Sequence, residues 1–400
     1  MSTSPETWPR VSLLSKNRAA ATLPICQFDA TGSARACPLV VPREDASGAA
    51  HGTAGHMLKR QTHIDALKII ASQLIVLHHF SAYGPLSEAM FEALPRVAAW
   101  LHDYARMAVQ VFLVLAGYLA VRILAPDGFL RAGAPWLRVW HRYQRLALPF
   151  VVAMVLAVAS SLLARYWFDA EFIPLAPTWG QMLAHAMLLH GVLDVDSLAA
   201  GVWYVAIDFQ LFALTTVVLW LGRRWVWLAR IGVMGLMLSS LLFLNRDAAW
   251  DNWAFYFFGA YGLGATAFWA ARSDRPGGML GLLAGAGLLA LAIDFRWRIA
   301  LALSTALLLG LAQWRDQTAR TSAGARLPGA VSHWIGRLAQ SSYALFLVHF
   351  SVLMLGNAAF VRLGLTGTVS AGLVLLTSWF VSMILAVWFE RWVERGTKMQ

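Results

Sequence analysis

Apolar segments long enough to cross a bilayer recur along most of this 400-residue chain, and they restrict its fold more than any other feature of the sequence. A helix of about 20 apolar residues spans the ~30 Å hydrocarbon core of a membrane. The composition agrees, because 59% of the residues are hydrophobic and only 13% are charged, unlike a typical soluble protein. The sequence therefore predicts an all-α polytopic membrane protein, a bundle of about ten transmembrane helices. The expected spans are residues 62–83, 107–125, 146–165, 203–221, 226–244, 253–270, 279–294, 297–314, 338–359 and 369–390.

The connections between these spans indicate how the chain is oriented, because cytoplasmic loops are enriched in Arg and Lys. These cations are concentrated in alternate connections, namely residues 131–145, 223–224, 272–275, 315–337 and 391–398. Both termini are therefore expected in the cytoplasm. The same rule explains the formal net charge of +11. Nucleic acid is not expected as a partner, because the cations form no continuous basic stripe.

The longest connection of the opposite set runs from Tyr166 to Val202 and has no Lys or Arg. Its apolar part, from Gln181 to Val192, is too short to span a membrane and is interrupted by His185 and His190. We therefore expect a re-entrant or interfacial helix in this connection.

The polar residues before the first span form a separate region. The stretch from Thr31 to Gly55 is rich in Ala, Gly, Pro and charge, while Met57 directly precedes the first apolar segment. We expect residues 1–56 to be a disordered cytoplasmic tail or an over-extended gene start. The membrane domain is then expected at residues 57–395, with a short cytoplasmic end at residues 396–400. Both cysteines of the chain lie in the N-terminal region, so the membrane domain has no cysteine-based metal site and no metal is expected.

Ionisable side chains interrupt the first span. Asp65, Lys68, His78 and His79 all lie within it, and ionisable groups at membrane depth usually face a cavity or the interior of the bundle. With the N-terminus inside, Lys68 lies near the cytoplasm, and His79 follows eleven residues later, about 16 Å further out. In the alternative reading, Lys68 extends its amine to the interface and the histidines only bond neighbouring helices.

Charged groups also mark the third and fourth spans. Arg142 and Arg145 share a helix face near the cytoplasmic end, and a pair of guanidinium groups suits a phosphate ligand. Ordinary positive-inside anchoring is the alternative. Asp208 lies about 7 Å inside the outer end of the fourth span, close to the expected depth of His79, so the two suit a base and its orienting partner. Independent stabilising contacts are the alternative for this pair.

The order of these residues resembles a known family. Residues Ile64-Asp65-Ala66-Leu67-Lys68, followed by ten residues and then His79-Phe80, resemble the opening of the acyltransferase-3 family of integral-membrane acyltransferases. Further features of the family follow in order across residues 57–395: Val111 to Tyr118, Arg142 and Arg145 with Pro149, Trp203 with Asp208 and Gln210, Ser342-Tyr343 with Leu347 and His349, and Glu390.

Three positions depart from the usual family pattern. Ala116 replaces a serine, Asp208 replaces a glutamate, and Arg391-Trp392 follows Glu390 where proline is common. The pattern of charge is kept at these positions. The departures therefore bear on the subfamily more than on the activity.

The resemblance implies that Lys68, Arg142 and Arg145 hold an acyl-coenzyme A donor and that His79 is the catalytic histidine. His79 would act as general base with Asp208 as its partner, or would carry the acyl group itself. Tyr204, Gln210, Tyr343 and His349 are all candidates for stabilising the oxyanion.

The expected function is O-acyl transfer in a bacterial inner membrane. An acyl group, expected to be acetyl, would move from cytoplasmic acyl-coenzyme A to a hydroxyl of an envelope polysaccharide, glycolipid or related acceptor. A transporter or flippase of lipid-linked sugars is the main alternative, but the repeated halves with interrupted helices typical of transporters are not evident. A scaffold subunit is a third reading, and it leaves the ordered motifs unexplained.

Overall fold

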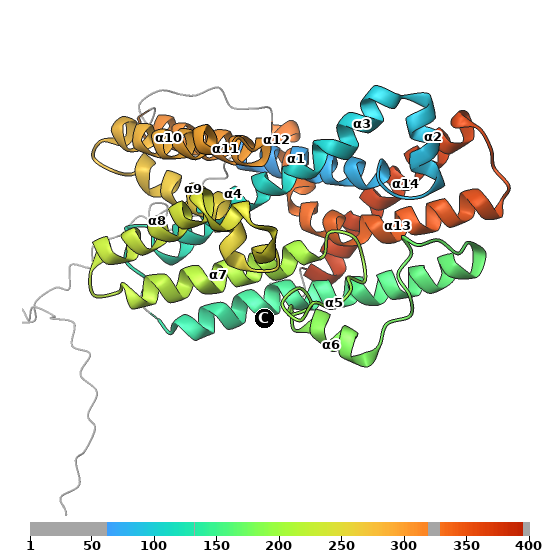
Figure 1. Ribbon diagram of the computed structural model, residues 1–400, viewed down its shortest axis with the longest axis horizontal. Helices are drawn as coiled ribbons and strands as arrows, with labels where there is room; N and C mark the ends of the chain where they lie inside the picture. Colours follow the sequence, from blue (N-terminus) through green and yellow to red (C-terminus); the bar gives the residue numbers. More distant parts are fainter. Residues whose placement is uncertain (1–61, 132, 319–328, 395–400) are drawn as a thin grey trace, which may run out of the picture. The chain divides into compact units, whose positions relative to one another are not determined.

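The structure is a computed structural model that describes residues 62–131, 133–318 and 329–394, and within these residues every regular element is a helix (Figure 1). In chain order the elements are α1 (Thr62–Phe80), α2 (Pro85–Ala93), α3 (Pro95–Asp103), η2 (Ala105–Ala108), α4 (Val109–Leu124), α5 (Pro135–Trp167), α6 (Trp179–Ala186), α7 (Trp203–Leu221), α8 (Val226–Leu242), η3 (Leu244–Arg246), η4 (Ala248–Trp250), α9 (Ala254–Ala271), α10 (Pro276–Ile293), α11 (Trp297–Thr318), α12 (Gly329–Gln340), α13 (Ser342–Arg362), α14 (Thr368–Phe389) and η6 (Glu390–Glu394). The expectations for residues 1–56 and 396–400 lie outside the described residues.

A helix occupies each of the ten expected spans, so the prediction of an all-helical, multi-pass membrane protein is confirmed. Eight helical stretches among the described residues are long and apolar enough to cross a membrane. They are α3 to α4 as one stretch, α5, α7, α8, α10, α11, α13 and α14. Helices α1 and α9 are not among these eight. The number ten and the side on which the termini lie stay predictions.

Helix α9 forms the centre of the part of the bundle made by α4, α8 and α11, and every one of its residues except Phe255 is buried. Its contact with α4 is made by backbone atoms. A Cβ atom added to Gly117 would lie 1.9 Å from the carbonyl oxygen of Tyr261, and one added to Gly264 would lie 2.0 Å from that of Val114. Small residues therefore let these two helices approach as closely as lipid-embedded helices do when van der Waals packing holds them together.

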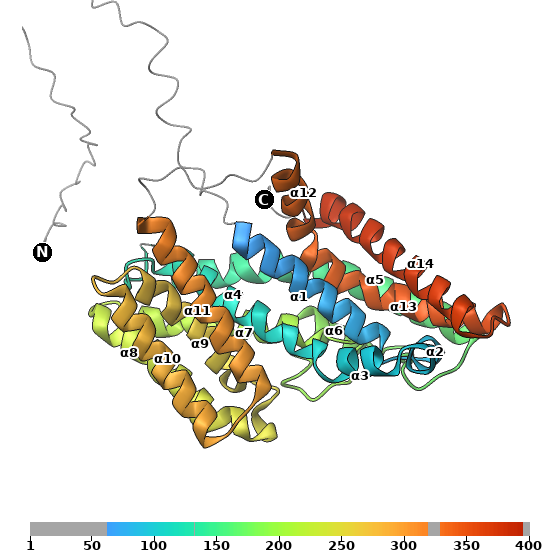
Figure 2. The ribbon, with the colours of Figure 1, turned by 90° about the horizontal axis from the view of Figure 1, so that it is seen from above.

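Helix α13 holds the other part of the bundle together by packing on α1, α5 and α14. Figure 2 shows α1 lying between α11 and α13. Half-buried Tyr343, at the start of α13, donates a hydrogen bond of 3.0 Å to the carbonyl oxygen of Leu146 in α5. This bond joins the start of α13 to α5, and α13 also packs on α1.

The chain between α5 and α7 contains a short helix, which covers only the first half of the expected segment from Gln181 to Val192. Helix α6 has only 8 residues and begins with a capping box, in which Thr178 and Gln181 bond each other's backbone. The side chain of His185 connects this helix to the following loop by two hydrogen bonds. Its Nδ1–H donates to the carbonyl oxygen of Gln181 at 2.8 Å, and its Nε2 accepts the N–H of Leu198 at 3.2 Å. The loop is thereby held where it leads into α7.

His190 lies in this loop in an unusual environment. Its ring is stacked on His185 with 4.2 Å between centroids, it is 1% exposed, and neither of its nitrogens has a hydrogen-bond partner among the described residues. Burial, with a further contribution from His185, lowers the pKa of His190 to about 4. His190 is therefore neutral in the folded protein at neutral pH.

We expect this histidine to make the protein less stable in mild acid. An unfolded histidine titrates near 6.5, so between about pH 6.5 and 4 the unfolded chain binds a proton that the folded chain does not, and stability falls as the pH falls. The loss reaches at most about 3 kcal/mol. Thermal unfolding in detergent at pH 7.5, 6 and 5 should show a smaller drop for His190→Leu than for the wild type. His141→Leu, which replaces an exposed histidine, is the control; equal drops in all three proteins would contradict the assignment.

Candidate active site

Two histidines meet where α1 contacts α13. The Nδ1 atom of His79 lies 2.7 Å from the Nε2 atom of His349, and the two rings are stacked with 4.9 Å between centroids. His79 is 6% exposed and His349 is fully buried. The pair therefore lies in the interior of the protein.

The hydrogen bonds of this pair define the tautomer of each ring. The Nδ1 atom of His349 is 2.9 Å from the carbonyl oxygen of Leu345. Since a carbonyl can only accept, this Nδ1 carries the proton, and in a neutral imidazole the opposite nitrogen is then an acceptor. The Nε2 atom of His349 therefore accepts the Nδ1–H of His79. The remaining nitrogen, Nε2 of His79, is left with a free lone pair, as a general base requires.

Gly201 brings the loop before α7 against this imidazole. Its φ of +80° is in the left-handed region, which glycine adopts without strain. A Cβ atom at this position would lie 3.3 Å from Cε1 of His79 and 3.4 Å from the ring of Phe346. The residue therefore has two reasons to be glycine, its backbone conformation and its close approach to the edge of the His79 ring.

Arg142 and Asp208 form a second polar cluster between α5 and α7. The Nη2 atom of Arg142 is 2.5 Å from Oδ2 of Asp208, and the Asp208 side chain is only 5% exposed. Tyr204 and Tyr261 lie close enough to interact electrostatically with this guanidinium. Its Nε is buried and has no hydrogen-bond partner among the described residues. Arg142 thus combines a buried carboxylate partner with a buried donor that has no partner among the described residues.

This arrangement corrects the expected pairing of Asp208 with His79. Asp208 bonds Arg142, and the partner of His79 is His349 from a helix for which no such contact was expected. The expectation rested on the similar depths of Asp208 and His79 in the fourth and first spans, and depth alone does not decide which helices pack together. Helix α5 is longer, with 33 residues against 19 in α7, and α7 runs beside the first part of α5 (Figure 1). Asp208, in the second turn of α7, thus meets Arg142 of α5.

The other expected site residues are dispersed around these two clusters. Trp203 stacks on Phe257 with 5.2 Å between centroids, and the side-chain oxygen of Gln210 accepts the N–H of Ala254 at 3.1 Å. The ring of Tyr204 packs against that of Phe346, with 5.6 Å between the centroids. The roles of the remaining candidates stay predictions; these are half-buried Lys68 in α1, exposed Arg145 in α5, Tyr343 in α13 and buried Glu390 in η6.

Two residues near the site were missed from the sequence. Gly201 stands directly before Val202-Trp203 at the expected start of a span, and a glycine at such a junction is a signal for a close backbone approach. Tyr261 carries one of the three hydroxyl groups of α9, with Tyr256 and Thr266, and polar groups within a span are functional candidates by default.

The fold is that of an integral-membrane protein, and its interior holds two buried polar clusters. Comparison with known families gives the class: the acyltransferase-3 family, described as an acyltransferase domain, matches residues 62–391. The chain belongs to this family, and it is therefore a multi-pass membrane acyltransferase, as the resemblance of its motifs indicated. No curated protein and no solved structure matches the chain.

Proposed function

We propose that this acyltransferase moves an acetyl group from cytoplasmic acetyl-coenzyme A to a hydroxyl of an envelope polysaccharide, glycolipid or related acceptor in a bacterial inner membrane. The observation that carries the proposal is the hydrogen-bonded chain from Leu345 through His349 to His79, which leaves Nε2 of His79 unprotonated. A hydroxyl acceptor needs such a base, because an alcohol is a weak nucleophile until its proton is removed. Family membership favours an enzyme over the alternative of a flippase.

In the proposed reaction, Nε2 of His79 takes the proton of the acceptor hydroxyl while the hydroxyl oxygen attacks the thioester carbonyl carbon. A carbon–oxygen bond forms, the carbon–sulfur bond breaks, and the proton passes from His79 to the departing coenzyme A thiolate. His349 acts through His79: its Nε2 accepts the Nδ1–H and supports the imidazolium that forms when Nε2 is protonated. The competing route, in which Nε2 attacks the thioester first, uses the same lone pair.

Three cations are proposed to bind the donor. Arg145 is exposed on α5, one turn beyond Arg142, and a guanidinium is well suited to a phosphate group. Arg142 keeps its buried Nε free while Asp208 holds Nη2. Half-buried Lys68 on α1 would be the third contact. In the orientation favoured by the distribution of charge, these residues are reached from the cytoplasm, where coenzyme A thioesters are made.

The direct test is transfer of labelled acetyl. Purified protein in nanodiscs, incubated with radiolabelled acetyl-coenzyme A and delipidated envelope glycan, should give label in the glycan that mild alkali releases as acetate. Propionyl- and palmitoyl-coenzyme A test the acyl group in parallel, and boiled protein is the control. Label that stays in phospholipid or protein, or transfer of palmitoyl in preference to acetyl, would overturn the assignment of acceptor or donor.

A further inference from the structure

A large cavity lies at one end of the bundle, apart from the two polar clusters described above. Its volume is about 750 Å³, which is large enough for a small-molecule ligand. The wall is formed by the first residues of α4, α7, α9 and α11 and by the segments that precede them. These four helices therefore run in the same direction, and the charge pattern assigns their beginnings to the outer side of the membrane.

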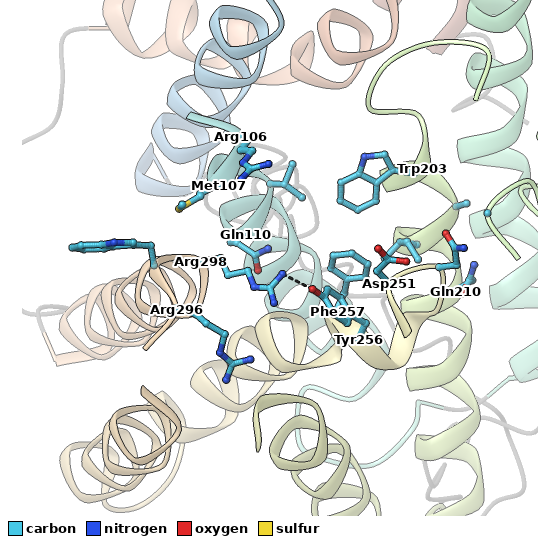
Figure 3. Close-up of a pocket in the computed structure, with 16 residues that line it drawn as sticks. Arg106, Met107, Gln110, Trp203, Gln210, Asp251, Tyr256, Phe257, Arg296 and Arg298 are labelled. Atoms are coloured by element: carbon cyan, nitrogen blue, oxygen red, sulfur yellow. Dashed lines mark hydrogen bonds between the residues drawn. The ribbon is translucent and has the colours of Figure 1, made fainter. Parts of the chain in front are cut away.

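The lining of this cavity, which we call the outer pocket, combines aromatic rings with cations (Figure 3). The aromatic members are Trp203, Tyr256, Phe257 and Trp297, and the cationic members are Arg106, Arg296 and Arg298. Asp251 is the one carboxylate in the lining. Aromatic faces stack on the apolar faces of sugar rings, while guanidinium groups bind carboxylates and phosphates.

The three arginines differ in how far their charge is already compensated. Arg296 is fully engaged: it forms an ion pair with Asp294 at 3.3 Å and donates to the Asn245 side chain and the Leu241 carbonyl at 2.7 Å each. It therefore serves the fold of the connection between α10 and α11. Arg298 and Arg106 are different, because neither forms an ion pair with a carboxylate in the part of the chain that the structure describes.

Arg298 is held in place by neutral groups. Its Nη1 donates to the hydroxyl of Tyr256 at 2.5 Å and its Nη2 to the carbonyl oxygen of Asn245 at 2.7 Å, as the dashed line in Figure 3 indicates for Tyr256. The guanidinium carbon lies 4.9 Å from the centre of the Tyr256 ring. A half-buried cation that is fixed in orientation and lacks a counter-ion is arranged for a ligand that carries the negative charge.

The opposite wall offers groups for a sugar. Trp203, which stacks on Phe257, faces the cavity. The side-chain nitrogen of Gln210 is buried and has no hydrogen-bond partner among the described residues, so it is available to a ligand hydroxyl. Trp203 also follows Gly201 by two residues, and Gly201 lies against His79. The same short segment thus contacts His79 through Gly201 and lines the outer pocket through Trp203.

We propose that the outer pocket receives the acceptor and that the acceptor is an anionic saccharide, whose carboxylate or phosphate binds Arg298 and Arg106 while its ring stacks on Trp203. This inference rests on the proposed glycan acceptor and adds the charge that the acceptor must carry. Arg298 fixes the position of the anion, and exposed Arg106, at the rim, draws it in by charge.

The test compares acidic and neutral acceptors with variants of the pocket. Binding of a glucuronate-containing oligosaccharide, its carboxyl-reduced neutral form and a sugar phosphate is measured by calorimetry on purified protein without coenzyme A. We expect the acidic ligands to bind at least about tenfold more tightly than the neutral one, because the neutral ligand cannot form the charged hydrogen bond to the arginines. Arg106→Gln and Arg298→Gln should each remove most of this preference, while Arg298→Lys keeps part of it.

Arg246→Gln is the matched control, because Arg246 binds Asp294 at the same end of the bundle at 3.3 Å but does not line the pocket. Arg106→Gln is expected to fold normally, since the only side-chain hydrogen bond of Arg106 among the described residues is a 3.3 Å contact with the Asp103 carbonyl. Equal binding of acidic and neutral saccharides, unaffected in both Gln variants, would overturn the inference even if acetyl transfer to glycan were intact. Charge-dependent binding without any acetyl transfer would instead support the pocket and contradict the proposed function. A preference for the sugar phosphate over the glucuronate identifies which anion the pocket takes.

Discussion

His79→Ala is expected to abolish acyl transfer, while His78→Ala retains it. The two side chains point about 100° apart on α1, and only His79 is bonded to His349, at 2.7 Å. His78 is half-buried and its Nδ1 lies 3.2 Å from the carbonyl oxygen of Leu101, at the end of α3, so it serves the packing of α1 on α3. Loss of a general base lowers the rate by roughly 10²-fold to 10⁴-fold. Initial rates of acetyl transfer at saturating donor measure the effect.

Coenzyme A binding distinguishes a lost base from a lost fold in this experiment. The proposed phosphate contacts lie on α5 and at the beginning of α1, so His79→Ala should bind coenzyme A with near wild-type affinity in calorimetry. A His79→Ala protein that is folded, binds the donor and turns over at the wild-type rate would remove the mechanism. If the acyl-histidine route operates, acid-quenched wild type should carry alkali-labile label and the variant should carry none.

His349 extends the same prediction to a positioning residue. His349→Gln keeps an acceptor for the Nδ1–H of His79, whereas His349→Leu removes it. We expect the leucine variant to lose much of kcat with little change in KM for the donor, and the glutamine variant to recover part of kcat. Equal kcat in the two variants would mean that His349 only fills space.

The positions of the helices could be predicted from the sequence, but their neighbours could not. Length and hydropathy are local properties, so each expected span other than 146–165 coincides with a helix within a few residues. The contact between His79 and His349 joins positions 270 residues apart, and it depends on which helices pack side by side. Nothing in the hydropathy of α1 or α13 encodes that choice. For this reason His349 was expected only as one of several oxyanion candidates.

The start of α5 shows a different limit of the sequence. The expected span began at residue 146, where the chain becomes continuously apolar, but the helix begins at Pro135. Proline is favoured at the first position of a helix, and the polar first turns carry Arg142 and Arg145. The hydropathy pattern identifies the part of a helix that lipid can accept, and it misses the polar turns beyond. Those turns contain the arginine that meets Asp208.

The contact between Arg142 and Asp208 leads to the prediction with the largest effect on stability. Removing one member of a buried ion pair leaves the other charge without compensation, at a cost of about 3–5 kcal/mol. We expect Asp208→Ala to unfold in detergent at a markedly lower temperature than the wild type. Asp169→Ala is the matched control: Asp169 also pairs with an arginine of α5, Arg165, but its side chain is 80% exposed, and exposed pairs contribute about 0–1 kcal/mol.

A double variant separates the structural part of this ion pair from its part in donor binding. Arg142→Met with Asp208→Leu removes both charges together and replaces them with side chains of similar volume, so much of the stability lost in Asp208→Ala should return. If Arg142 also binds the donor through its free Nε, coenzyme A binding by the refolded double variant should stay weak, by about tenfold or more. Wild-type donor affinity in a stable double variant would show that the pair only holds α5 against α7, and the phosphate contact would then fall to Arg145 and Lys68.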